Sequence, residues 1–282
     1  MKQFFHNVLT YIISALSIIE AKFFCLVSNK SSYGWVPDKP DHRDLKYSDH
    51  VGHLYTSISP LPTIVDMRSQ CTEIWNQDTL GACTAHAVGA QFEFLQRKEK
   101  IAEFMPSRLF IYYNERVIEG TVCLDAGATI RDSIKAVATN GVCPESLWKY
   151  TISKFKVKPS SACYTAATKH KALKYLRVNR NLIEMKKCLA DGFPFIFGFT
   201  VYENFESEEV AKTGMALMPS KSEKSLGGHA VMAVGYNDNK GAFLVRNSWG
   251  KDWGLGGYFY LPYDYFTNSN LSDDFWTIRL VN

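Results

Sequence analysis

The sequence feature that most constrains the fold is a change of hydrophobic pattern near Gly192. Before this point apolar side chains recur at helical spacing, as in Cys83 to Lys98, where Val88, Phe92 and Leu95 follow one another at intervals of three or four residues. After it the apolar runs are short or alternating, and glycines and polar turns separate them. A chain that changes from helices to strands in this way is expected to form an α+β protein, with a helical lobe and a lobe built on an antiparallel sheet or barrel.

The patterns predict where the main elements begin and end. Helices are expected at residues 83–98, 106–118, 129–140 and 181–191, with Asn140-Gly141 and Gly192 as stop signals. Strands are expected at residues 193–202, 229–236, 242–247, 257–261 and 275–281. A cleft between two such lobes is a usual place for a functional site.

The start of the chain has the pattern of a targeting segment. An apolar run from Val8 to Ile19 follows Lys2 and His6, and its length fits the core of a signal peptide better than a membrane span. No clear cleavage site follows, so an uncleaved membrane anchor over residues 7–27 stays open. Because both alternatives lead into or onto membranes of an oxidising compartment, we expect a location in the secretory pathway, lysosome-like or extracellular, with a single-pass membrane-anchored protein as the alternative.

Residues 28–60 connect this start to a globular part that spans residues 61–282. They are rich in Ser, Pro, Asp, His and Tyr and lack periodicity, which is typical of a linker or a short pro-segment. The stretch YGWVPDKPDHRDL contains two prolines and Trp35, so it could lie extended on a partner surface. A disordered connector and an intramolecular pro-segment both remain open.

Charge and cysteine content limit the classes of function. The net charge is +4 and the two signs are interspersed, so the sequence does not indicate nucleic-acid binding. The seven cysteines include no Cys-x-x-Cys pair, and neither a metal site nor a cofactor site is predicted. If one cysteine is a nucleophile, six remain, which is enough for three disulfide bonds, unless several are buried free thiols.

Cys83 is the best candidate for a nucleophile. It follows the loop NQDTLGA and opens a predicted helix, where the positive end of the helix dipole favours a thiolate. Gly81 permits a tight turn and leaves space for a substrate carbonyl. The side-chain amide of Gln77 and the backbone N–H of Cys83 could together form an oxyanion hole.

A thiolate needs a proton partner, and His229 is the histidine best placed to be one. It follows Gly227-Gly228 and opens the apolar strand HAVMAVGY. Asn247 ends a later strand, and its amide oxygen could accept a hydrogen bond from the imidazole and fix its tautomer. Trp249 could cover that hydrogen bond. Of the other histidines in the globular part, His170 in a Lys-rich stretch is expected to be solvated, and His86 is expected to pack in the core.

These segments resemble the papain-like cysteine peptidases, a family that includes the cathepsins, from about Leu61 to the C-terminus. The matching stretches occur in the family's order: LPTIVDMRSQ, NQDTLGACTAHA, GGHAVMAVGYN and NSWGKDWGLGGYFYL. The resemblance implies a papain-like α+β fold with the active-site cleft between a helical lobe (about residues 71–165) and an antiparallel β-barrel-like lobe (about residues 166–282 plus 61–70). It implies a thiol protease acting on peptide or protein substrates, without a cofactor, and made as a zymogen with a short pro-segment.

The resemblance also implies a role for each matching residue. The catalytic roles are Cys83 as nucleophile, His229 as general base and acid, Asn247 as the residue that orients it, and Gln77 as oxyanion donor. The substrate-binding positions are Gly127 in LDAGA, Gly228 and Trp249.

Three departures from the family pattern concern the walls of the cleft. Leu80 and Thr84 stand where the family usually has a cysteine and an aromatic residue, so one familiar disulfide cannot form. Gly228 stands where many members carry Asp or Asn. No paired-histidine occluding insertion is present, which favours endopeptidase action. A catalytically silent binding protein and an acyltransferase on the same thiol are the alternatives from other classes.

Overall fold

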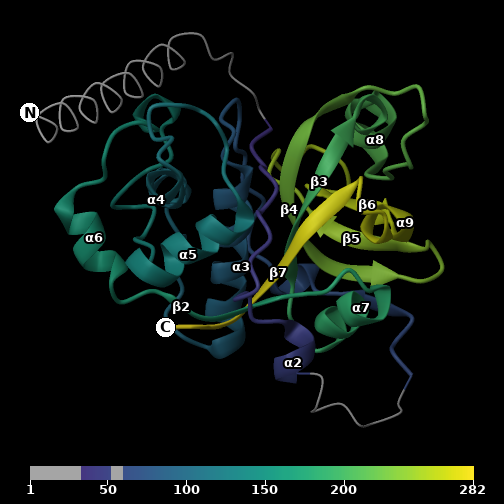
Figure 1. The fold of residues 1–282 in the computed structure, drawn as a ribbon, viewed down its shortest axis with the longest axis horizontal. Helices are drawn as coiled ribbons and strands as arrows, with labels where there is room; N and C mark the ends of the chain where they lie inside the picture. Colours follow the sequence, from purple (N-terminus) through teal and green to yellow (C-terminus); the bar gives the residue numbers. More distant parts are fainter. Residues whose placement is uncertain (1–32, 52–59) are drawn as a thin grey trace, which may run out of the picture.

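The computed structural model describes residues 33–51 and 60–282, and it places helices on one side of the molecule and a sheet on the other (Figure 1). The α-helices are α2 (Tyr47–Val51), α3 (Cys83–Glu99), α4 (Arg108–Glu119), α5 (Ile130–Asn140), α6 (Ser161–Ala167), α7 (Leu182–Ala190), α8 (Glu208–Thr213) and α9 (Tyr263–Thr267). The strands are β1 (Ile64–Asp66), β2 (Ala172–Arg177), β3 (Phe195–Tyr202), β4 (Ser225–Asn237), β5 (Ala242–Arg246), β6 (Tyr258–Pro262) and β7 (Ser272–Val281).

The four longer predicted helices are confirmed within two residues at each end. Side chains cap three of their N-termini: Ser107 accepts from the backbone N–H of Phe110, Thr129 from that of Asp132, and Asn181 from that of Glu184. Such caps satisfy backbone donors that the first helical turn leaves unpaired. The predicted strands are confirmed too, whereas short elements such as α6, α8 and β2 carried no recognised pattern.

The sheet of the second lobe is antiparallel and open. Its strand order is β2-β7-β3-β4-β5-β6, and β1 pairs with β4 beside this path. The expected α+β class is therefore confirmed, but the barrel-like closure is not found, because β2 and β6 are the two ends of the path and do not pair. Helices α7 and α9 pack on the sheet and bury apolar side chains of its face.

Helix α3 joins the two lobes. Every residue from Cys83 to Gln96 is buried, so the helix has no solvent-facing side along most of its length. It packs against α4 on the helical side and against β4 and β7 on the sheet side. The first residue of this helix is consequently held where the helical lobe meets the sheet.

The segment of residues 33–46, called the cleft segment below, runs between the two lobes (purple in Figure 1). Trp35 forms a parallel bridge with Ala128 of the helical lobe, and Lys46 forms one with Arg177 of β2. The sequence left a disordered connector and an intramolecular pro-segment open for residues 28–60. The described part of the segment lies extended along the protein surface and contacts both lobes.

The cysteines differ from the expectation of three disulfide bonds. Cys71, Cys83, Cys143, Cys163 and Cys188 are free thiols, and Cys25 lies outside the described residues. Four of these free thiols, Cys83, Cys143, Cys163 and Cys188, are fully buried and pack as small apolar side chains in three clusters.

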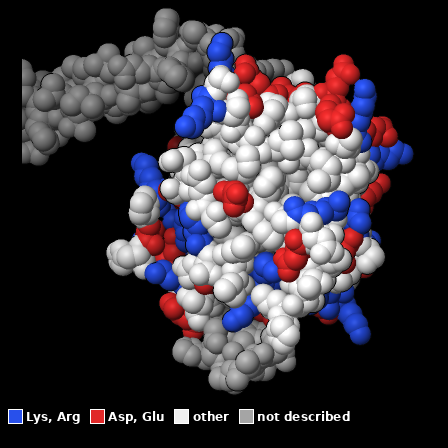
Figure 2. Space-filling view, turned by 90° about the vertical axis from the view of Figure 1, so that its right-hand side faces the viewer, with Lys and Arg blue, Asp and Glu red and all other residues white. Residues whose placement is uncertain are grey.

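The proposed anchor over residues 7–27 also lies outside the described part of the chain. Within residues 33–51 and 60–282, no helix has the length and apolar character needed to cross a bilayer. On the face shown in Figure 2, acidic and basic side chains are interspersed around a broad uncharged area, as the sequence suggested.

Candidate active site

Cys83 lies at the first position of α3 and is completely buried. Burial raises the pKa of its thiol to about 12, although the backbone N–H groups of Ala230 and Gly34 oppose this shift. The sequence suggested that the helix dipole favours a thiolate, whereas in this closed arrangement burial acts in the opposite direction and favours the thiol. The contact with Ala230 places the sulfur beside the residue that follows His229.

His229 and Asn247 come together as predicted. The Nε2 atom of His229 lies 2.8 Å from Oδ1 of Asn247, and both side chains are buried. Because the amide oxygen can only accept, His229 carries its proton on Nε2 and leaves Nδ1 as the basic nitrogen. Desolvation lowers the pKa of His229 to about 4, so the ring is neutral here. Trp249 stacks on the imidazole at a centroid distance of 4.9 Å and covers the hydrogen bond.

Gln77 is fixed from several directions. Its Nε2 donates to the carbonyl of Leu80 at 3.0 Å, and its Oε1 accepts from the hydroxyl of Ser248 at 2.6 Å. Its backbone N–H donates to the carbonyl of Ser248 at 2.8 Å. The amide nitrogen therefore points toward the loop that leads into Cys83, which is the orientation that an oxyanion donor needs.

The predicted substrate-binding glycines are covered by the cleft segment. The backbone N–H of Trp35 donates to the carbonyl of Gly228 at 2.9 Å, and the N–H of Ala128 donates to the carbonyl of Gly34 at 2.8 Å. A Cβ added to Gly127, which has φ +69°, would lie 2.0 Å from the carbonyl oxygen of Gly34. The segment thus forms hydrogen bonds with backbone groups on both walls of the site.

The side chain of Trp35 fills a space left by small residues. An added Cβ at Gly198 would lie 1.9 Å from its indole, and one at Gly228 would lie 2.8 Å from it. The indole Nε1 donates to Oδ2 of Asp274 at 3.1 Å. Tyr33, two residues earlier, packs edge-on against His229. Three consecutive residues of the segment therefore lie over the thiol, the imidazole and the wall beside them.

A cluster of carboxylates and guanidinium groups holds the following part of the segment. Its members are Asp38 and Asp44 of the segment, Arg131 of α5, Arg177 of β2 and Asp274 of β7. Arg177 lies 3.2 Å from Asp38 and 2.9 Å from Asp274, and Arg131 lies 2.5 Å from Asp44. The three carboxyl groups are 0–11% exposed, so three buried carboxyl groups share two guanidinium groups.

Within this cluster Asp38 is the most enclosed group. It accepts from the indole N–H of Trp276 at 2.8 Å, and its own backbone N–H donates to Asp274 at 2.7 Å. Burial, together with repulsion from Asp274, raises the pKa of Asp38 to about 7. Sequence reasoning missed these residues, since Asp38 and Asp274 lie far apart in the chain and neither belongs to a recognised motif.

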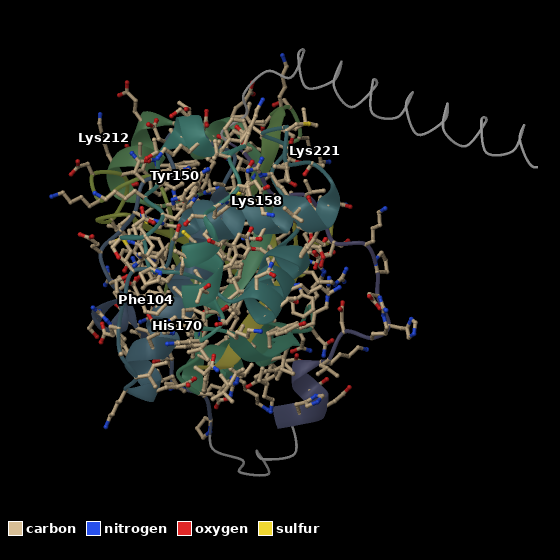
Figure 3. All side chains as sticks on the ribbon, turned by 90° about the vertical axis from the view of Figure 1, so that its left-hand side faces the viewer. Phe104, Tyr150, Lys158, His170, Lys212 and Lys221 are labelled. Carbon is tan, nitrogen blue, oxygen red and sulfur yellow. The ribbon has the colours of Figure 1, made fainter. Side chains whose placement is uncertain are left out.

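Two histidines that the sequence set aside are both packed. His86 is 1% exposed, as expected for a core position. His170 was expected to be solvated, but its ring lies 4.5 Å from that of Phe104 on the helical side of the molecule (Figure 3) and is half-buried. Within the described parts of the chain, no group of three or more His, Cys, Asp or Glu side chains could hold a metal ion.

Known proteins share this sequence pattern and this fold. Residues 61–274 match the family model of papain family cysteine proteases. An uncharacterised peptidase C1-like protein of Acanthamoeba polyphaga mimivirus is 42% identical over 272 residues, which cover 89% of this chain and 87% of that protein.

Solved structures agree with the family match. Xylellain, a cysteine protease from Xylella fastidiosa, has a TM-score of 0.82 at 40% identity, and the match covers 90% of this chain and 98% of that one. Procathepsin L 3 of Tenebrio molitor larval midgut has a TM-score of 0.65 at 16% identity over 92% of this chain and 79% of that one, which concerns the fold alone. The chain therefore belongs to the papain family of cysteine proteases.

Proposed function

We propose that the protein is a cysteine endopeptidase that hydrolyses peptide bonds through a thiol acyl-enzyme, and that residues 28–60 are a short pro-segment that keeps it inactive. The observation that carries the first part is the buried pair of His229 and Asn247 beside Cys83 at the start of α3. This arrangement supplies a nucleophile, a base with a fixed tautomer and a residue that orients the base.

In the proposed reaction Nδ1 of His229 takes the proton of the Cys83 thiol while the sulfur attacks the peptide carbonyl. The side-chain amide of Gln77 and the backbone N–H of Cys83 stabilise the oxyanion. His229 then gives the proton to the leaving amine as the C–N bond breaks. Water attacks the thioester, His229 accepts its proton, and the C–S bond breaks to release the acid and restore the thiol.

The inhibitory role of the segment is supported by what faces the sulfur. The backbone N–H of Gly34 is directed at Cys83, so the segment presents a hydrogen-bond donor to the nucleophile. A Cβ added to Gly34 would lie 1.8 Å from the carbonyl oxygen of Gly81, so only glycine fits at this position. The segment would therefore occupy the site without being a substrate there.

Labelling and product analysis separate the proposal from its alternatives. A thiol-directed epoxide should modify Cys83 in a chain that starts at Leu61 and should do so far more slowly in the full chain. Absence of labelling in both would favour a silent binding protein. Formation of an amide in the presence of an added amine, without hydrolysis, would favour an acyltransferase.

Replacing Asn247 with Ala is expected to lower kcat by about 10–100-fold and to leave KM within about threefold. The reason is that the substitution frees the imidazole to rotate but removes neither the nucleophile nor the base. Steady-state kinetics on a fluorogenic peptide would measure this, with Asn268→Ala at the C-terminal end of α9 as the control. Full activity of the Asn247→Ala variant would contradict the orienting role.

The binding of the cleft segment to the two lobes is expected to weaken as the pH rises from 5 to 8. The pKa of Asp38 is about 7 when the segment is docked and returns to the ordinary value when it is released, so the docked state binds the extra proton. The stabilisation from that proton is present at acidic pH and is lost as the pH passes through 7. Above this value Asp38 and Asp274 are both ionised and repel each other across the cluster.

This pH effect can be measured as a ratio. The turnover of the full chain divided by that of a chain that starts at Leu61 cancels the pH dependence of catalysis itself, and we expect the ratio to rise by up to about a hundredfold between pH 5 and 8. Asp38→Asn should remove most of that rise, because an amide does not titrate. A ratio that falls with pH would show that another group controls release.

A further inference from the structure

A small cavity lies beside Asn247, and His229 is not among the residues that line it. Its walls come from α3, β4 and the end of β5, and the lining residues include Trp75, His86, Met232, Arg246 and Asn247. All of these are buried, with exposures of 1–5%. The space open to the centre of a water molecule is about 10 Å³, which is close to the volume that one water needs.

Three polar atoms that line this cavity have no hydrogen-bond partner among the described residues. They are Nε1 of Trp75, Nε2 of His86 and Nδ2 of Asn247. A buried polar atom without a hydrogen-bond partner destabilises the fold, so three around one space would be costly. A cavity with such a lining differs from the apolar cavities that stay dry.

The hydrogen-bonding role of each atom can be assigned. The Nδ1 atom of His86 lies 2.9 Å from the carbonyl oxygen of Ala82, so Nδ1 carries the proton and Nε2 is an acceptor. Burial lowers the pKa of His86 to about 3, which keeps the ring neutral and Nε2 unprotonated. The indole N–H of Trp75 and the amide NH₂ of Asn247 are donors. Two donors and one acceptor around one space match a water molecule, which can accept twice and donate to His86.

We propose that one buried water in this cavity links Trp75 and His86 to Asn247, and that His86 and Trp75 are positioning residues for the active site. The amide of Asn247 is useful only in one of its two orientations. Its Oδ1 must face His229, at 2.8 Å, and it also accepts from the backbone N–H of Ser248 at 2.8 Å. A water that accepts from Nδ2 holds the amide from the opposite side and disfavours the flipped form.

The catalytic consequence rests on the proposed function, but the water itself does not. A crystal structure of the full chain at about 1.5 Å resolution should show one ordered water within hydrogen-bond distance of the three atoms. Absence of density there, with other buried waters visible, would overturn the proposal. Because this observation needs no activity, it also stands if Cys83 proves not to be the nucleophile.

The substitution that tests positioning is His86→Phe, which keeps an aromatic ring and removes the acceptor. We expect kcat to fall about tenfold with KM unchanged, because the substitution misaligns the reacting groups and does not change substrate binding. The variant and the unsubstituted protein are both measured as full chains, so the cleft segment inhibits them equally. The Nε2–H proton of His229, followed by ¹⁵N-edited NMR, should exchange faster with solvent.

Two further variants separate positioning from packing. His86→Gln offers an amide oxygen toward the cavity and should recover at least half of the lost kcat and the slow exchange of the His229 proton. His170→Phe, at a packed histidine on the far side of the helical lobe, should change neither. If His86→Phe fails to fold, the Trp75→Phe variant, which removes one donor, gives the same NMR readout. An unchanged His229 signal in a folded variant would contradict the proposal.

Discussion

Replacing Cys83 with Ala is expected to abolish peptide hydrolysis, with kcat falling by about 10⁵-fold or more. The other members of the site cannot substitute for the sulfur, because water without a thiolate gives no acyl-enzyme. The fold should survive, since the substitution removes a single buried atom from a helix start and costs about 1 kcal/mol. Turnover of a fluorogenic peptide and a thermal melt, measured on a chain that starts at Leu61, would test both expectations.

The matched control for this experiment is Cys188→Ala. Cys188 is also a fully buried free thiol with a pKa raised to about 12 by burial, but it lies on α7 against the sheet. Its loss should reduce stability by a similar amount and leave kcat unchanged. Substantial turnover by the Cys83→Ala variant, or an equal loss in both variants, would rule out Cys83 as the nucleophile.

Replacing Trp35 with Ala in the full chain is expected to raise peptide turnover by about 100-fold. The indole packs on Gly198 and Gly228 and donates to Asp274, and losing a large aromatic side chain from such a site costs about 3 kcal/mol. That free energy corresponds to roughly a hundredfold in the equilibrium between the docked and released segment. Initial rates on the full chain, before any processing visible on a gel, give the measurement.

Val36→Ala is the control within the same segment. Val36 is 41% exposed, and its contribution to docking is a backbone N–H that donates to Ala128 at 3.0 Å, which alanine retains. This variant should therefore behave like the unsubstituted chain. If Trp35→Ala shows no gain while the chain that starts at Leu61 is active, the segment inhibits by contacts other than Trp35. If neither is more active than the full chain, residues 28–60 are not inhibitory.

The main elements could be predicted because their signals are local. Helix α3 follows from the spacing of Val88, Phe92 and Leu95, and β4 follows from the apolar run after His229. The pairing of His229 with Asn247 was also predictable, since a base and an orienting amide must meet for the proposed reaction. What these residues do in catalysis is still a prediction.

The cleft segment could not be predicted in the same way. Its path depends on partners far away in the chain: Trp35 meets Gly198 and Asp274, and no periodicity encodes such contacts. The same holds for the raised pKa of Cys83. The helix start is visible in the sequence, but the burial that raises the pKa of the thiol comes from tertiary packing.

Because the cleft segment belongs to the same chain as the site it covers, its docking is intramolecular. A tethered ligand of this kind competes at an effective concentration of about millimolar, whatever the concentration of the protein. Cleavage between Val51 and Leu61 would convert the same contacts into a bimolecular complex, present at only the concentration of the enzyme. Dilution would then favour release of the cut segment, although its contacts at Gly34, Trp35 and Asp38 are unchanged by the cut.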